Sequence, residues 1–304
     1  MSSEPDCKYV SSRGILKSCA VISSLPTSSI RTLVGYDFSR LKAGDLVYIC
    51  NSAIPAFVRD VFPSLKVPFR LVSGDCDESC PTELFHNAEE FLQFIDDSRI
   101  LVWYAQNCVH VTHPKLRQLP IGQDYHTMSG QSGWGPPANP LNQEQLLDAI
   151  KEKALPLDER KCMAYSNFHF SMQTKYAFDR REAIDKVPKD LVFYEPERCW
   201  RMKTWKNQSE YAFVVSPHGN GLDCHRTWEA LCLGCIPIMK TSPLDPLFEG
   251  LPVLIVKDWS DVTRELLETT QREYASREFQ KEKLLLSYWI DRINDSSPSG
   301  ETNV

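Results

Sequence analysis

The fold is decided by residues 211–238, which read "YAFVVSPHGNGLDCHRTWEALCLGCIPI". The stretch opens with "YAFVVSP", an apolar run with the β-branched and aromatic content of a buried strand. Two glycines follow in "HGNGLD", "CHRTWEALCLG" then has the pattern of a helix that closes at Gly234, and "IPI" begins another strand. A strand, a helix and a strand in succession predict a parallel sheet covered by helices.

Similar alternation extends over the whole chain. Apolar runs of strand length cover 45–50, 69–75, 100–107 and 116–122, and then 161–168, 191–196, 211–217, 236–240 and 252–259. Helices are expected over 82–97, 142–154 and 261–293, and the Gly- and Pro-rich segment 127–143 is expected to be a loop. The sequence therefore predicts an α/β protein of two tandem units, 1–150 and 151–304, on either side of a cleft. We expect the terminal helix to pack back toward the first unit.

Composition narrows the function classes. The 304 residues are 42% hydrophobic and 24% charged, with a formal net charge of −6, which is typical of a globular protein. That charge argues against a chain-wide nucleic-acid surface, although a local basic pocket for a small anion remains possible. No window has the ~18 apolar residues of a membrane span, and the start "MSSEPDCKYV" lacks a signal-peptide pattern. We therefore expect a cytoplasmic protein with no nucleic-acid partner and no membrane span.

The central motif predicts an anion site. The first turn of a helix has unpaired N–H groups and the positive end of the helix dipole, and glycines let the backbone approach a ligand. Arg226 lies in that turn and can add a bidentate charge, and Glu229 lies one turn deeper, where a carboxylate can accept ribose hydroxyls. This arrangement favours a nucleoside diphosphate. The alternative is a purely structural helix after a glycine turn.

Zinc is a second alternative, since Cys224, His225, Cys232 and Cys235 fall in the same motif. Compact zinc sites pair their ligands around a short loop, whereas these residues are split between the two ends of the expected helix. The spacing therefore favours the anion site. Most of the 11 cysteines are expected to be small buried hydrophobic residues.

Residues 216–259 resemble the nucleotide-binding core of exostosin-like glycosyltransferases, through a strand, an "SP-x-G" turn, an Arg/Glu helix and a "G-C-I-P" exit. The resemblance implies the GT-B fold, in which two Rossmann-like domains face a cleft, and a nucleotide-sugar donor. We expect a compact cytosolic chain without a membrane anchor, and such a chain resembles the chlorella-virus xylosyltransferases of capsid glycan synthesis. This resemblance implies UDP-xylose and, for a viral protein, the host cytoplasm. The N-terminal half resembles the family only in its general organisation.

The resemblance also implies roles for residues of the motif. Arg226 would contact the diphosphate and Glu229 the ribose. The other residues expected to bind the donor are Ser216, His218, Gly219, Asn220, Gly221 and, after an earlier strand, Asn167. Many relatives have Arg in place of His218.

The catalytic base is expected in "VSGDCDESC" (72–80), at the carboxyl end of a strand of the first unit. A carboxylate facing the donor can take the proton of the acceptor hydroxyl, and one base with direct displacement inverts the anomeric centre. Asp75 is the first candidate and Asp77 the second. The alternative is a polar loop whose acids cap the next helix.

The segment "LPIGQDYHTM" (119–128) gives the remaining candidates. His126 is a third possible base or an acceptor ligand, and Asp124 and Tyr125 are expected to bind the acceptor. Trp134 is expected to stack on an acceptor sugar.

The sequence thus predicts an inverting glycosyltransferase that uses a UDP-sugar, most plausibly UDP-xylose, and a glycan acceptor. No metal and no cofactor are expected, because the helix N-terminus and Arg226 would neutralise the leaving diphosphate. The alternatives are a catalytically silent nucleotide-sugar-binding protein and a nucleotide-sugar epimerase. No G-x-G-x-x-G follows an early strand, which disfavours a dinucleotide enzyme.

Overall fold

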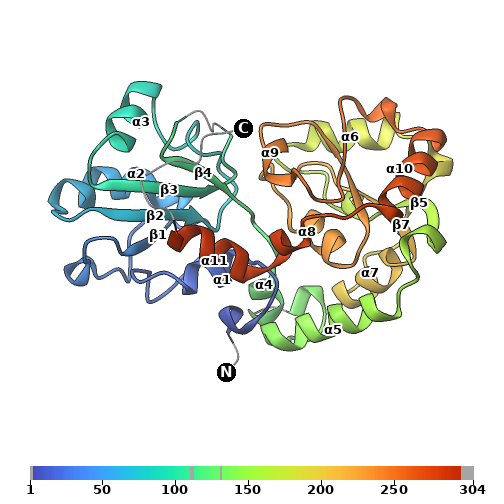
Figure 1. Ribbon diagram of the computed structural model, residues 1–304, viewed down its shortest axis with the longest axis horizontal. Helices are drawn as coiled ribbons and strands as arrows, with labels where there is room; N and C mark the ends of the chain where they lie inside the picture. The colour runs from blue at the N-terminus through green and yellow to red at the C-terminus, as the bar shows by residue number, and fades with distance from the viewer. Residues whose placement is uncertain (1–2, 110–112, 131, 296–304) are drawn as a thin grey trace.

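The computed structural model describes residues 3–109, 113–130 and 132–295. Within them, two parallel sheets form two α/β units (Figure 1). The first sheet has the order β1-β2-β3-β4 and the second the order β6-β5-β7-β8-β9. The strands are β1 (Leu46–Cys50), β2 (Phe69–Gly74), β3 (Ile100–Gln106), β4 (Leu116–Leu119), β5 (Lys161–Ser166), β6 (Val192–Tyr194), β7 (Tyr211–Val215), β8 (Ile236–Lys240) and β9 (Leu254–Val256). The α/β architecture with two parallel sheets is confirmed, and each of the nine expected strands is present.

Helices connect and cover the strands. They are α1 (Ser12–Lys17), α2 (Ile54–Ala56), α3 (Ala88–Ile95), α4 (Tyr125–Gly130), α5 (Pro140–Lys153), α6 (Ala177–Lys186), α7 (Arg201–Gln208), α8 (His225–Cys232), α9 (Asp245–Phe248), α10 (Arg264–Ser276) and α11 (Leu286–Asp295). None of these helices, in the part of the chain that the structure describes, is long and apolar enough to cross a bilayer.

Two expected helices are shorter or broken. The helix expected over 82–97 is only α3, because the Asn87 side chain caps it by accepting the Glu90 N–H, at 2.8 Å. The helix expected over 261–293 was wrong as a single element. It splits into α10 and α11 where the Gln280 N–H turns away to bond the Gly250 carbonyl, at 2.9 Å. Periodicity continues through that break, so the sequence pattern alone does not reveal it.

The split lets α11 leave the second unit and lie beside α1 on the first (Figure 1). The Arg70 side chain on β2 holds it there by donating to the carbonyls of Ile293 and Asn294, at 2.9 and 2.8 Å. The boundary expected at residue 150 falls within α5, which packs on α7. The exact division of the chain into domains stays a prediction.

Three apolar clusters stabilise the fold. One lies in the first unit around Trp103, and another lies in the second unit around Trp259. The third is shared, because Tyr48 of β1, Trp228 of α8 and Trp289 of α11 belong to the same buried cluster. Burial of large aromatic side chains from both units favours their association through the hydrophobic effect.

Hydrogen bonds also connect the two units beside this shared core. Asn107 follows β3, and its Oδ1 accepts the N–H of Asp223, at 2.9 Å. The Asp223 carboxylate accepts the N–H of Ile121, at 2.7 Å, and the indole N–H of Trp228, at 2.8 Å. Asp223 lies two residues before the start of α8, so these bonds orient the N-terminus of α8 toward the first unit.

Gly122 lies against the N-terminal segment within the first unit. Its φ is +65°, and a Cβ there would lie 2.2 Å from the Val10 carbonyl oxygen. Gly122→Ala is expected to cost about 3 kcal/mol or more of unfolding free energy, because backbone strain and a backbone clash add. Gly44→Ala is the control, since Gly44 has φ +84° but open space around it, and about 1 kcal/mol is expected. Urea unfolding measures both, and equal losses would contradict the close approach.

Candidate active site

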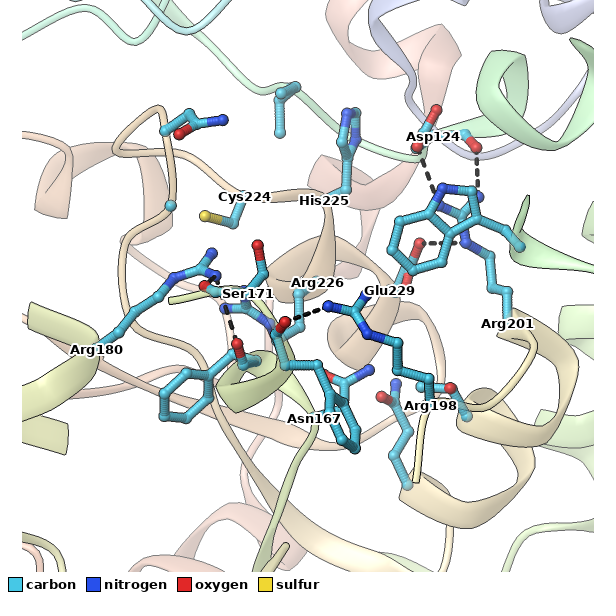
Figure 2. Close-up of a pocket in the computed structure, with 18 of the residues that line it drawn as sticks. Asp124, Asn167, Ser171, Arg180, Arg198, Arg201, Cys224, His225, Arg226 and Glu229 are labelled. Carbon is cyan, nitrogen blue, oxygen red and sulfur yellow. Dashed lines mark hydrogen bonds and ion pairs between the residues drawn. The ribbon is translucent and has the colours of Figure 1, made fainter. Parts of the chain in front are cut away.

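A pocket of about 460 Å³ lies between the two units (Figure 2). It lies at the carboxyl ends of β5 and β7, where the order of the second sheet switches direction. Open parallel sheets bind ligands at such a point. Its lining is Asp77, Ile121, Asp124, Gly133, Trp134, Asn167, Phe168, Phe170, Ser171, Arg180, Glu195, Arg198, Cys199, Arg201, Thr204, Gln208, Gly219, Asn220, Gly221, Asp223, Cys224, His225, Arg226 and Glu229.

The N-terminus of α8 opens into this pocket. Cys224 precedes the helix without a side-chain capping bond, and Arg226 occupies the first turn, as predicted. The Arg226 Nη1 donates to the Pro217 carbonyl, at 3.0 Å, and to the Ser216 hydroxyl, at 3.2 Å. Both partners are neutral, so they position the guanidinium without compensating its charge.

Arg180 on α6 supplies a second positive charge that sequence reasoning missed. Its guanidinium donates to the carbonyls of His218 and Ser171. Burial and the neighbouring charge of Arg226 lower the pKa of Arg180 to about 10. Two guanidiniums that repel each other beside a helix N-terminus form a site that an anion would stabilise.

Some residues of the glycine turn line the pocket, and others support the conformation of the turn. Gly219, Asn220 and Gly221 line the pocket, as does Asn167 after β5. Two other predicted donor ligands, Ser216 and His218, are buried and are absent from the lining. The Ser216 hydroxyl pairs with that of Thr227, at 2.8 Å, and the His218 Nδ1 bonds the Leu222 carbonyl, at 2.9 Å. These two side chains shape the turn.

Glu229 lines the pocket one turn deeper than Arg226, but it is already paired. Its Oε1 lies 3.4 Å from the Nε of Arg201, which also donates to the Asp124 carboxylate, at 3.0 Å. All three side chains are buried. Burial alone would lower the pKa of Arg201, but Glu229 and Asp124 outweigh that effect and raise it. Arg201 thus joins Asp124 of the first unit to Glu229 of the second.

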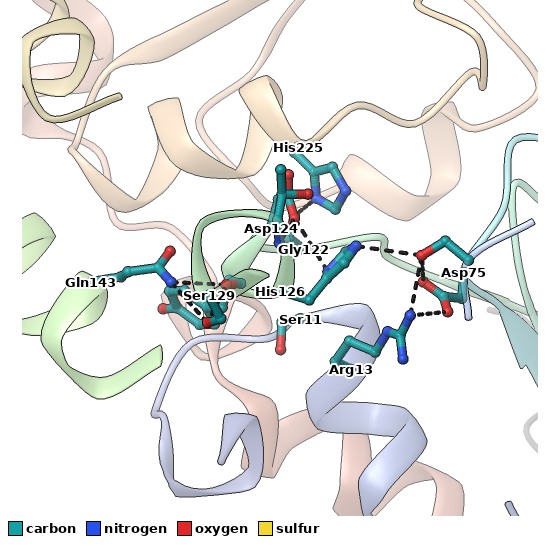
Figure 3. Close-up of polar contacts among 12 residues, drawn as sticks. Ser11, Arg13, Asp75, Gly122, Asp124, His126, Ser129, Gln143 and His225 are labelled. Carbon is teal, nitrogen blue, oxygen red and sulfur yellow. Dashed lines mark hydrogen bonds and ion pairs between the residues drawn. The ribbon is translucent and has the colours of Figure 1, made fainter. Parts of the chain in front are cut away.

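Of the two expected bases, Asp77 faces the pocket and Asp75 does not. Asp75 is buried, ion-paired with Arg13 at 3.0 Å, and accepts the Ser28 hydroxyl at 2.9 Å (Figure 3). Asp77 keeps an exposed surface in the pocket, but the surrounding protein removes part of its hydration, and this desolvation, together with the neighbouring Glu78 charge, raises its pKa. A carboxylate with a raised pKa is the better proton acceptor, so the geometry favours Asp77 over Asp75.

Of the candidates in segment 119–128, Asp124 lines the pocket, and His126 and Tyr125 do not. His126 lies between Asp124 and Asp75 (Figure 3), outside the pocket lining, and burial lowers its pKa. Tyr125 is buried and donates to Glu144, at 2.9 Å, so it is not presented to the pocket. Asp124 lines the pocket, but Arg201 occupies its Oδ2. The adjacent positive charges hold the pKa of Asp124 well below its usual value despite burial.

Trp134 lines the pocket and is 45% exposed, with the Arg201 guanidinium 5.5 Å from its ring. The ring therefore remains accessible at the rim, as an acceptor platform would require.

His225 is a pocket residue that the sequence analysis considered only as a zinc ligand. Its Nδ1 lies 2.7 Å from the Gly122 carbonyl oxygen. A carbonyl oxygen can only accept, so Nδ1 carries a proton in this contact. The motif "DCHR" contained this residue, but its tautomer depends on a carbonyl 103 positions away.

The four residues considered for zinc do not form a cluster. No group of three or more potential ligands that could hold a metal occurs within residues 3–109, 113–130 and 132–295. Cys232 accepts a hydrogen bond from Gln123, at 3.2 Å, and Cys235 from Arg160, at 3.3 Å, so both thiols belong to the buried core.

No model of a known protein family matches this chain, and no curated protein matches it in sequence. Among solved structures, the chain is similar to an α1,3-fucosyltransferase with GDP, at 12% sequence identity and a TM-score of 0.36. The similarity covers 88% of this chain and 83% of that enzyme. A likeness of this strength identifies no donor and no acceptor. The structure shows two parallel α/β sheets with a pocket between them, and the GT-B assignment stays a prediction.

Removal of the Arg201 charge should destabilise the protein. Arg201→Met leaves two buried carboxylates without their cation, so a loss of about 3–5 kcal/mol in unfolding free energy is expected. Arg264→Met is the matched control, because its ion pair with Asp190 is exposed, and a change below about 1 kcal/mol is expected. Chemical denaturation measures the unfolding free energy of both variants. Similar losses would show that the contacts of Arg201 with Asp124 and Glu229 do not stabilise the protein as described.

Proposed function

We propose that this protein is an inverting glycosyltransferase that moves a sugar from a UDP-sugar to a hydroxyl group of a glycan. The observation that carries the proposal is the convergence of the α8 N-terminus, Arg226 and Arg180 on one pocket at the switch point of the second sheet. Helix N–H groups and two guanidiniums recognise a diphosphate, which is the leaving group of such a donor.

The donor would lie along α8. Its diphosphate would contact Arg226, Arg180 and the backbone of the glycine turn, and its ribose would reach Glu229. Since Arg201 holds one oxygen of Glu229, the carboxylate is oriented as an acceptor for ribose hydroxyls. Fixed positive charge at the leaving diphosphate supports its departure without a metal.

The acceptor would approach from the first unit. Asp77 would take the proton of the acceptor hydroxyl while that oxygen forms a bond to the anomeric carbon. The bond from the anomeric carbon to the diphosphate oxygen breaks, and the diphosphate leaves with its electron pair. A single displacement inverts the anomeric configuration, and Trp134 would support the acceptor ring. Asp75 and His126 remain secondary candidates for the base because they lie outside the pocket lining.

UDP-xylose is the first donor to test, because the resemblance to the chlorella-virus xylosyltransferases implies it. A screen for UDP release with and without an acceptor separates the three functional classes. A glycosyltransferase needs the acceptor, an epimerase interconverts donors without one, and a silent binder holds UDP without turnover. Loss of activity with EDTA would overturn the metal-free mechanism.

Arg226→Gln tests the anion site. We expect the affinity for UDP to fall roughly 10- to 100-fold, because a charge-assisted contact to the diphosphate is lost. Arg181→Gln is the control. Arg181 is an exposed residue of α6 adjacent to Arg180, so this substitution removes the same charge outside the pocket. Calorimetry measures both, and an unchanged affinity in Arg226→Gln would place the diphosphate elsewhere.

Asp77→Asn tests the base. We expect kcat to fall on the order of 10²- to 10⁴-fold with UDP affinity nearly unchanged, because the proton acceptor is lost. In the wild type, kcat/KM should fall as pH decreases through the raised pKa of Asp77, because the protonated carboxyl cannot accept a proton. Asp75→Asn should lower the melting temperature by breaking the Arg13 ion pair. If Asp77→Asn keeps its turnover while Asp75→Asn loses it at unchanged UDP affinity, Asp75 is the base.

A further inference from the structure

The deep end of the pocket is lined by polar side chains that are almost fully buried. Glu195 is 4% exposed, Thr204 is 7% exposed and Gln208 is 1% exposed. The Nε2 of Gln208 has no hydrogen-bond partner among the described residues. Buried amide donors are rarely left unpaired, because the lost hydration is not recovered. A ligand atom that accepts from Gln208 would complete this group.

The position of Gln208 relative to α8 suggests which part of a ligand reaches it. Arg226 lies in the first turn of α8, and Glu229 lies one turn further. The backbone carbonyl of Gln208 lies 3.5 Å from the Sγ of Cys235, just beyond the other end of the helix. A helix of eight residues is about 12 Å long, so the backbone of Gln208 is separated from the anion site by roughly that length. A nucleoside diphosphate presents its parts in this order, with phosphates first, then ribose, then base.

One face of α7 lines the pocket up to this end. Arg201, Thr204 and Gln208 are spaced by three and four residues, and all three line the cavity. Arg201 fixes Glu229 at the middle of the pocket, and Gln208 ends the row. Glu195, which also lines this end, is fixed as well, because its Oε2 accepts the Tyr165 hydroxyl and the Asn207 amide of α7, at 2.7 and 2.8 Å. This end of the pocket is therefore polar, buried and held in place.

We propose that Gln208 recognises the nucleobase of the donor, by pairing its carboxamide with an edge that carries a ring N–H beside a carbonyl. The inference rests on the proposed function, since it assumes that the pocket binds a nucleoside diphosphate. The Oε1 of Gln208 accepts the ring N–H, and its unpaired Nε2 donates to the carbonyl oxygen. Uracil and guanine share this edge. Cytosine and adenine present an amino group beside an unprotonated ring nitrogen, which the carboxamide would match only after a half-turn that puts Oε1 in the position of the unpaired Nε2.

Binding of UDP, GDP, CDP, ADP and inorganic pyrophosphate to the wild type and to Gln208→Leu tests the proposal. Calorimetry should give the wild type at least about tenfold preference for UDP or GDP over CDP and ADP. Whichever of UDP and GDP binds more tightly identifies the base. In Gln208→Leu this preference should fall on the order of tenfold, with pyrophosphate affinity unchanged.

A second measurement separates recognition from a structural role. Because the Gln208 Nε2 is unpaired, an apolar side chain of similar size should not lower the melting temperature. Gln143→Leu is the matched control. Gln143 is also 1% exposed and lies outside the pocket lining, but its Nε2 donates to the carbonyls of Tyr125 and Ala138, at 2.8 and 2.7 Å. That variant should lose stability and keep its nucleotide affinity.

Two results would overturn the inference, and they are distinguishable. If the wild type binds all four diphosphates equally, or Gln208→Leu keeps the wild-type preference, then Gln208 does not recognise the base and the proposed function still stands. If the wild type binds no nucleoside diphosphate, the proposed function fails and the base assignment fails with it.

Discussion

The arrangement of the pocket depends on one buried cation. The Arg201 guanidinium lies between the carboxylates of Asp124 and Glu229, which belong to different units of the fold. None of these three charges could be buried alone at an acceptable free-energy cost, so each requires the others. Asp124 therefore stays ionised in the pocket wall, and Glu229 is held facing the cavity.

The four arginines of the pocket fall into two chemical groups. The charge of Arg201 is neutralised by the carboxylates of Asp124 and Glu229. Arg201 therefore positions these side chains and adds little to the positive potential of the pocket. Arg226 and Arg180 bond to neutral oxygens, so their positive charge is available to a ligand. Arg198 donates only to the Phe170 carbonyl among the contacts described, and its charge adds to theirs. An acidic chain with a net charge of −6 can thus hold an anion, because the local field decides binding.

The same junction orients the first turn of α8. Asp223 accepts two N–H donors, while burial raises its pKa to about 6. His225 donates from Nδ1 to Gly122. These bonds bring the N-terminus of α8 toward the loop after β4, so the anion site and Asp77 line one cavity. Donor and acceptor chemistry meet there because the two units share a core around Trp228.

The sequence by itself determined the nine strands, the two parallel sheets and the helix that begins near Arg226, because these follow from local periodicity and from the glycine turn. It also marked Asp77, Asn167 and Glu229 as pocket residues. Only the tertiary structure decided that Asp75 pairs with Arg13, that Arg201 joins the units and that the Nε2 of Gln208 has no partner among the described residues. Charge pairing and burial depend on residues far apart in the chain, and no local pattern records which distant groups meet.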